Sequence, residues 1–167
     1  MKTRRKYLLL PLLLCIAAAC SNQHERLTLV QVNQPSELEN GISFDMDIEQ
    51  GYTYSTAIVC SIDAAQLFKE KVNLSLEVIA PNYDSFKEKV TFPLVQNGSQ
   101  RAALGGERAA VRFQRHGSLL DNQWGWRRGI TCDTLPGRWR VIITADNPTD
   151  MNRIRAVGFS YKGEADE

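Results

Sequence analysis

The chain has 167 residues, of which 43% are hydrophobic and 23% charged, and it carries a formal net charge of +1. This length allows one domain with a substantial core, and no internal repeat or second linker divides it. These values exclude a multi-domain organisation. The small net charge is unremarkable, so function has to be inferred from how charged and apolar residues are distributed along the chain.

The chain begins with a short apolar segment, Tyr7–Ala19, that follows four basic residues. It is shorter than the roughly 20 residues of a transmembrane helix. A basic start, an apolar centre and small residues before a break are typical of a secretory signal peptide. Ala17-Ala18-Ala19-Cys20 also resembles the lipobox of bacterial lipoproteins, whose cysteine is acylated, with palmitate for example, and becomes the mature N-terminus. We therefore predict a signal peptide over residues 1–19, lipidation at Cys20 and a lipidated tether over residues 20–26.

This interpretation has two alternatives. One is a plain signal peptide in which Cys20 is incidental, and the other is export through a twin-arginine signal at Arg4-Arg5 instead of the general secretory route. If Cys20 is acylated, each buried methylene contributes about 0.8 kcal/mol, so two or three chains hold the protein stably in a membrane. The mature chain is then a soluble domain tethered to a membrane, and nucleic acid is not an expected partner.

Between residues 27 and 162, short apolar–polar alternations are separated by turn residues. The clearest alternation is at 72–78, with the period of two that is typical of a half-buried strand. Residues 63–71 predict one helical turn or a long connection, and a change of phase in the last segment predicts a bulge near Ala156–Gly158. Strands are expected at residues 27–32, 42–48, 52–62, 72–78, 86–94, 108–115, 122–132, 138–143 and 153–162.

Many short strands with almost no helix predict an all-β fold. Because the connections are too short for crossover helices, both sheets should be antiparallel. We therefore expect a single antiparallel β-sandwich domain, immunoglobulin-like or jelly-roll-like, over residues 27–162. Residues 163–167 should form a polar tail.

Charge is divided unevenly between the two halves of the mature chain. Residues 20–97 hold five basic and 11 acidic side chains, whereas residues 98–155 hold ten arginines, no lysine and five acidic side chains. Arginine forms fixed, forked hydrogen bonds to carboxylates and phosphates. The pattern predicts either internal pairing between the halves or a basic face that meets an anionic partner.

Two cysteines, Cys60 and Cys132, remain in the mature chain besides Cys20. An oxidising compartment permits a disulfide between them, and closing so long a loop would add about 4 kcal/mol of stability. The alternative is two separately buried thiols. No metal site is expected, because the other soft ligands are His24, in the tether, and His116.

Three tryptophans offer candidate contacts. Trp139 alternates with apolar residues and is assigned to the core, whereas Trp124 and Trp126 share one face of an extended segment beside Arg127 and Arg128. Such an aromatic and cationic group is typical of protein interfaces. We predict these four residues as a partner-binding patch. One alternative is a glycan-binding surface made by the two indoles, and another is that the indoles cap the end of the sandwich.

No persuasive catalytic arrangement is present, so an enzyme and a cofactor are not expected. His116 and Ser118 are too close along an extended chain to face each other. Asp45 and Asp47 share one strand face and are the best alternative site, for calcium or glycoside chemistry. Acidic side chains on an edge strand are, however, commonly a protection against edge-to-edge pairing.

The order of these features resembles the GldH family of gliding motility lipoproteins of Bacteroidetes. The resemblance includes the lipobox at Cys20, the strands "YTYSTAIVCSID" and "VNLSLEVIAP", and a loop through Phe68 between them. It is strongest in the closing segment "PGRWRVIITADNPTDMNRIRAVGFSYK". The resemblance implies a non-enzymatic component of an envelope assembly linked to gliding motility and type IX secretion, with an envelope protein as partner.

The residues after Cys20 also bear on location. Surface-exposed lipoproteins of this phylum commonly carry an acidic run directly after the lipidated cysteine, and Ser21–Arg26 lacks one. We therefore expect a lipid-anchored domain in the outer membrane that faces the periplasm.

Overall fold

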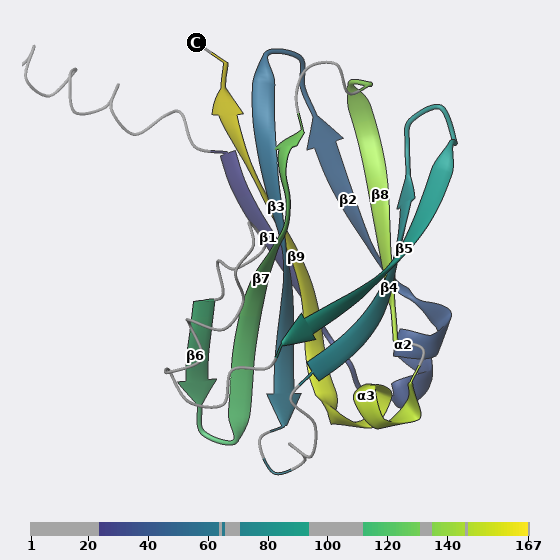
Figure 1. Cartoon of the computed structure of the whole chain (residues 1–167), viewed down its shortest axis with the longest axis vertical. Helices are drawn as coiled ribbons and strands as arrows, with labels where there is room; N and C mark the ends of the chain where they lie inside the picture. Colours follow the sequence, from purple (N-terminus) through teal and green to yellow (C-terminus); the bar gives the residue numbers. More distant parts are fainter. Residues whose placement is uncertain are drawn as a thin grey trace, which may run out of the picture.

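The computed structural model describes residues 24–63, 65, 71–93, 112–130, 135–145 and 147–166, and it forms a two-layer β-sandwich (Figure 1). The strands are β1 (His24–Gln31), β2 (Ile42–Ile48), β3 (Tyr52–Asp63), β4 (Lys71–Ile79), β5 (Ser85–Pro93), β6 (Arg112–His116), β7 (Leu119–Ile130), β8 (Gly137–Thr144) and β9 (Ile154–Ala165). Two short helices, α2 (Pro35–Asn40) and α3 (Pro148–Arg153), complete the elements.

The described strands form two sheets. The first sheet has the order β1-β9-β3-β7-β6 and the second has the order β2-β8-β4-β5. All pairings between these strands are antiparallel. The predicted antiparallel sandwich is therefore confirmed, with the last strand of the chain inserted between the first and the third.

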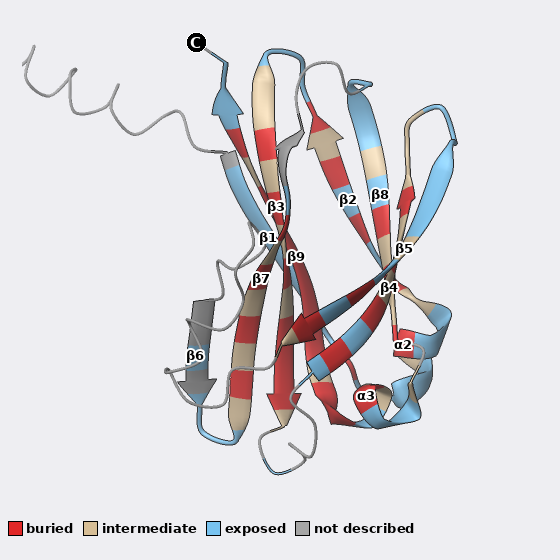
Figure 2. Cartoon of the chain, viewed as in Figure 1, coloured by how far each residue is buried: buried red, intermediate tan, exposed pale blue. Residues whose placement is uncertain are grey.

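The core lies between the sheets because each strand turns its apolar side chains inward. Strand β2 alternates buried and more exposed residues along its whole length, and β4 does the same. Figure 2 shows the buried residues as bands across the strands, where the two layers face each other. Fully burying one large aliphatic or aromatic side chain contributes about 1.5–3 kcal/mol. Central members of the core are Phe44, Ile58, Cys60, Leu74, Leu76, Phe92, Val141, Ile143 and Phe159.

Strand β9 contains the predicted bulge, one residue before the expected range. Ser61 pairs with Ala156 and Ile62 pairs with Ile154, so Arg155 is the extra residue. From Ala156 to Tyr161 the strand is buried on both faces, because the residues on the face away from the core, Ala156, Gly158 and Ser160, are small and lie between β1 and β3. A methyl group at Gly158 would lie 2.9 Å from the backbone carbonyl oxygen of Thr28 on β1, so only glycine fits there.

Both helices occupy segments for which loops were expected. Pro35 and Pro148 stand in the first turns of α2 and α3, a position that suits proline. The side chain of Asn147 caps α3 by accepting a hydrogen bond from the Thr149 N–H at 2.9 Å. Short helices with few apolar residues leave little periodic signal, which explains the difference.

Three strand boundaries also differ from expectation. Strand β1 begins at His24 instead of residue 27, so only residues 21–23 separate it from Cys20. Strand β9 continues to Ala165, into the expected polar tail. Strand β7 is continuous over Leu119–Ile130, where the sequence pattern was irregular. No helix in the described ranges is long and apolar enough to span a membrane.

Candidate partner-binding surface

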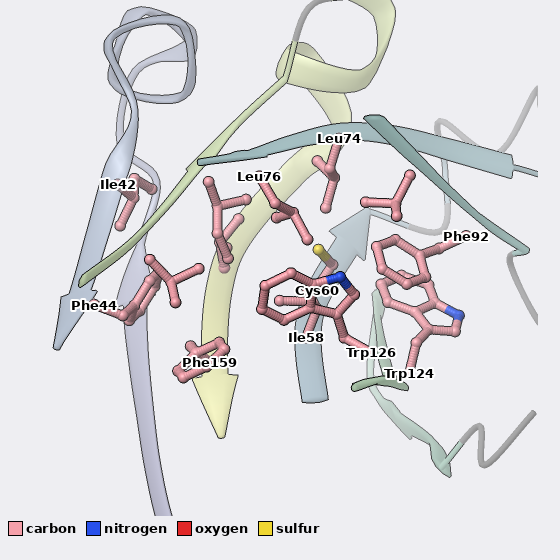
Figure 3. Packing of buried hydrophobic residues seen from close by; sticks show 14 of the residues in the cluster. Ile42, Phe44, Ile58, Cys60, Leu74, Leu76, Phe92, Trp124, Trp126 and Phe159 are labelled. Atoms are coloured by element: carbon pink, nitrogen blue, oxygen red, sulfur yellow. The ribbon is translucent and has the colours of Figure 1, made fainter. Parts of the chain in front are cut away.

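The structure places Trp124 and Trp126 in the core, which corrects their assignment to an exposed partner-binding patch. Their exposed fractions are 1% and 6%. The Trp124 ring stacks on Phe92 with 4.7 Å between ring centroids, as Figure 3 shows. Its indole N–H donates to the carbonyl oxygen of Pro93 at 2.8 Å. A buried indole whose N–H is bonded inside the protein has no face to offer a glycan or a partner.

A bulge in β7 determines where Arg127 lies. Ala57 pairs with Gly125 and Thr56 pairs with Arg127, so Trp126 is the extra residue in β7. Trp126 and Arg127 therefore both turn toward the second sheet. The sequence correctly placed the two tryptophans on one face, but it could not show that this face meets the second sheet.

Arg127 of β7 contacts β5 and so links the first sheet to the second. It forms an ion pair with Glu88 of β5, whose carboxylate also accepts a hydrogen bond from the Trp126 indole at 3.1 Å. The guanidinium lies 5.2 Å from the Phe86 ring centroid and 5.1 Å from that of Trp126. These contacts neutralise and hold Arg127, so it does not present a free charge to an acidic partner. The side chain of Arg128 and the whole of Cys20 lie outside the described residues.

The other described arginines of the basic half are also paired. Arg138 lies 3.2 Å from Asp47, and Arg140 lies 3.2 Å from Asp45. Internal pairing between the two halves, one of the two expected outcomes, is therefore what these side chains do. Exposed pairs of this kind contribute about 0–1 kcal/mol each. The pairs between halves are Arg127–Glu88, Arg138–Asp47, Arg140–Asp45 and Arg155–Asp63.

His116, one of the candidate catalytic residues, contacts the carboxylate of Asp121. Among the described residues, no group of three or more His, Cys, Asp or Glu side chains could hold a metal ion. His116 Nε2 lies 3.6 Å from Asp121, and the Ser61 hydroxyl donates to the same carboxylate at 2.5 Å. The Asp121 carboxylate thus lies between the Ser61 hydroxyl and the His116 imidazole.

A buried ion pair joins α3 to the second sheet. Asp150 and Arg153 are 0% and 1% exposed and pair with each other. Arg153 also donates to the carbonyl oxygen of Lys71, and the Asn73 N–H donates to Asp150 at 3.2 Å. Sequence analysis had counted Arg153 with the basic half of the chain and missed this pair. The sequence did contain a signal for this pair: Asp150 and Arg153 are three residues apart and follow Pro148, which suits the start of a helix.

Cys60 is a fully buried free cysteine. It pairs with Asn122 in the sheet, whereas Ile130, two residues before Cys132, pairs with Tyr54 near the other end of β3. The alternative of a separate buried thiol therefore describes Cys60. Cys132 itself lies outside the described residues. Burial raises the pKa of the Cys60 thiol to about 12, from an ordinary value of 9.0.

This pKa predicts a loss of stability at alkaline pH. The unfolded chain releases the Cys60 proton near pH 9 and the folded chain only near pH 12. Stability is therefore full below pH 9 and falls by about 1.4 kcal/mol per pH unit above it. Urea unfolding at pH 8 and pH 10.5 should show a loss about 2 kcal/mol larger for the wild type than for Cys60→Ala. Equal losses would contradict the buried thiol.

A surface that the sequence pattern did not reveal is the outer edge of β1, which pairs with no other described strand and is called the open edge below. Leu27 and Leu29 are 58% and 51% exposed. The Val32 N–H donates to Arg155 of β9 at 2.8 Å. Because N–H groups alternate in direction along an antiparallel strand, those of Glu25, Leu27 and Leu29 point away from β9. No described residue accepts a hydrogen bond from them.

The edges of the other three outer strands are protected. Strand β5 carries two lysines and ends at Pro93, and β6 has only five residues. Along β2, the Asp47 N–H donates to Tyr161 at 3.4 Å, and just past its end the Glu49 N–H donates to Tyr54 at 3.0 Å. Charges, proline, short length and covering side chains are the usual means of blocking an edge.

Strand β1 has few of these protections. It is eight residues long, contains neither proline nor lysine, and pairs with β9 without a register shift. An edge of this kind is a template for a strand from another chain. The exposed leucines add apolar contact area beside that template. The open edge of β1, with Leu27 and Leu29, is therefore the best candidate for a partner-binding surface.

Comparison with known proteins finds no matching family, no matching curated protein and no matching solved structure. The candidate surface therefore rests on its own geometry.

Proposed function

We propose that the protein is a lipid-anchored component of an outer-membrane assembly that works by binding an envelope protein. In this proposal Cys20 carries the acyl chains and the sandwich faces the periplasm. The resemblance to the GldH family supports a role linked to gliding motility and type IX secretion. The lipobox and the short apolar leader support the anchor.

The single observation that carries the binding function is the open edge of β1. It is a regular strand of eight residues with two exposed leucines, and it begins four residues after Cys20. A partner strand added there would gain backbone hydrogen bonds and cover both leucines. The position also suits a partner that is itself held at the same membrane.

The glycan-binding alternative loses its support, because the two indoles meant to stack on sugars are buried. The Asp45 and Asp47 site loses support for a different reason. Both carboxylates are engaged by arginines of the neighbouring strand. Protein binding is therefore the function that we retain.

Capture of the partner tests this function. Membranes that contain the tagged lipoprotein are crosslinked, solubilised and purified, and we expect one abundant envelope protein in near-stoichiometric amount. The double variant Leu27→Lys and Leu29→Lys should reduce its recovery about tenfold or more, since it charges the centre of the proposed contact. Quantitative mass spectrometry of the purified material measures the recovery.

A matched control places the same charges on another outer strand. Ser85→Lys and Thr91→Lys alter two exposed positions of β5 and should leave recovery unchanged. Both double variants should melt at the wild-type temperature. Equal recovery with the β1 variant and the wild type would exclude this edge as the binding surface.

A further inference from the structure

One end of the sandwich gathers the start of β1, the start of β3 and the end of β9. His24 of β1 and Tyr54 of β3 both pair with Gly163 of β9. The turn between β2 and β3 lies at the same end, and Ile48 of β2 pairs there with Gly137, the first residue of β8. We call this the anchor end, because the chain enters it from Cys20.

The hairpin between β4 and β5 also lies at the anchor end. A methyl group at Gly137 would lie 3.0 Å from Pro81 in the hairpin. Leu135 is close by, because its carbonyl oxygen accepts a hydrogen bond from the Trp139 indole at 2.8 Å. Figure 1 shows the starts of β1 and β8, the turn before β3 and this hairpin toward the same end of the molecule.

The length of the tether limits how far this end can lie from a bilayer. Residues 21–23 are the whole connection between Cys20 and β1. Fully extended, the four steps from Cys20 to His24 span about 14 Å. Strand β3, with 12 residues, extends about 40 Å toward the opposite end. An acylated Cys20 therefore keeps the anchor end close to the membrane, and the end with α3 remote from it.

The anchor end presents two apolar side chains to solvent. Tyr83, at the tip of the β4–β5 hairpin, is 88% exposed and Leu135 is 45% exposed. Tyr83 also has a φ of +69°, which is uncommon for a bulky residue. The Tyr83 N–H donates to Ala80 at 2.9 Å, and the Ala80 N–H donates to Asp84 at 2.8 Å. The tight turn thus holds the aromatic ring outward.

Charge does not favour an anionic surface at this end. The described carboxylates at this end outnumber the cationic side chains: Glu25, Asp47, Glu49, Asp84, Glu164 and Asp166 against Arg26, Arg138 and Lys162. Electrostatic attraction to anionic headgroups therefore does not favour membrane binding at this end. The features that fit a bilayer are a tyrosine, which prefers the interface between headgroups and acyl chains, and an exposed leucine.

We propose that Tyr83 and Leu135 insert into the headgroup region of the membrane that anchors the protein. This inference rests on lipidation of Cys20, which is part of the proposed function. Two side chains are too few to recruit the free domain to a bilayer. When the acyl chains hold the domain within reach, the same contacts act at a high effective concentration and set its orientation. The open edge of β1 is then presented at a fixed height above the membrane.

Fluorescence quenching in the full lipoprotein tests this orientation. The protein, with Cys132→Ser, is reconstituted in phosphatidylcholine vesicles that contain a headgroup-attached quencher. A fluorophore is placed at Ser85→Cys, beside Tyr83, or at Ser118→Cys, in the turn after β6 at the opposite end. The buried Cys60 does not compete for the label. We expect several-fold stronger quenching at position 85 than at position 118.

A second pair of variants removes the contact without disturbing the fold. Tyr83→Asn suits the positive φ of this position, and Leu135→Gln changes an exposed side chain. Together they should lower quenching at position 85 toward the level at position 118 without reaching it, because the tether still holds the anchor end near the membrane. Unchanged quenching at position 85 in this double variant would contradict the contact. Equal quenching of the two labels in the otherwise unchanged protein would overturn the contact.

The mass of the N-terminal peptide in the same sample separates two failures. An acylated peptide with equal quenching would overturn only the contact of Tyr83 and Leu135. A peptide without acyl groups would overturn the anchor, and with it both this contact and the anchored part of the proposed function. Strong quenching at position 85 that falls in the double variant supports both.

Discussion

Replacing Trp124 by alanine is expected to lower the free energy of unfolding by about 3–5 kcal/mol, because it empties a large site in the core. The indole is 1% exposed and stacks on Phe92, and its N–H is bonded to Pro93. Removing it deletes the ring contact and leaves that carbonyl oxygen without its buried donor. Urea unfolding followed by circular dichroism measures the loss.

The exposed aromatic Tyr83 provides the control for this experiment. Tyr83→Asn removes a ring that is 88% exposed, and it should leave the free energy of unfolding within about 0.5 kcal/mol of the wild type. A Trp124→Ala variant as stable as Tyr83→Asn would contradict the burial of Trp124. It would also restore the glycan-binding alternative, which needs that indole at the surface.

Replacing Arg153 by alanine should destabilise the protein by about 3–5 kcal/mol, because Asp150 would keep a buried charge without its partner. The two side chains are 1% and 0% exposed. Asp150→Ala should have an effect of similar size. The double variant Asp150→Leu and Arg153→Met should lose much less than the sum of the single losses, since it leaves no unpaired charge behind.

An exposed ion pair serves as the comparison. Arg140→Ala breaks the pair with Asp45, whose side chains are 54% and 45% exposed, and should change stability by about 1 kcal/mol at most. Denaturant unfolding of the variants at one pH measures all of these differences. Similar small losses for Arg140→Ala and Arg153→Ala would show that the pair at α3 is not buried in solution.

The strands of the second sheet could be located from sequence because their pattern is regular. Residues 42–48 and 72–78 alternate cleanly, and the structure has β2 and β4 there. Strand β7 was less clear for two physical reasons. Asn122 is a polar residue that faces inward, and the bulge at Trp126 breaks the period of two.

The candidate site could not be predicted because it depends on contacts between distant strands. A local pattern shows that Trp124 and Trp126 share a face, but only the packing of β5 over that face decides that they are buried. The free edge of β1 likewise follows from the order of strands in the first sheet. No local property of Leu27 or Leu29 distinguishes an outer strand from an inner one.

The position of β9 determines when the protein can fold. Strand β9 lies between β1 and β3, so the first sheet has no continuous centre until the last dozen residues are present. A chain that is synthesised amino end first must therefore keep β1 unpaired until its carboxyl end is present. Such long-range pairing makes folding slow. Loss of the carboxyl-terminal segment by premature termination would remove the neighbour of two strands at once and leave β1 without a strand to pair with.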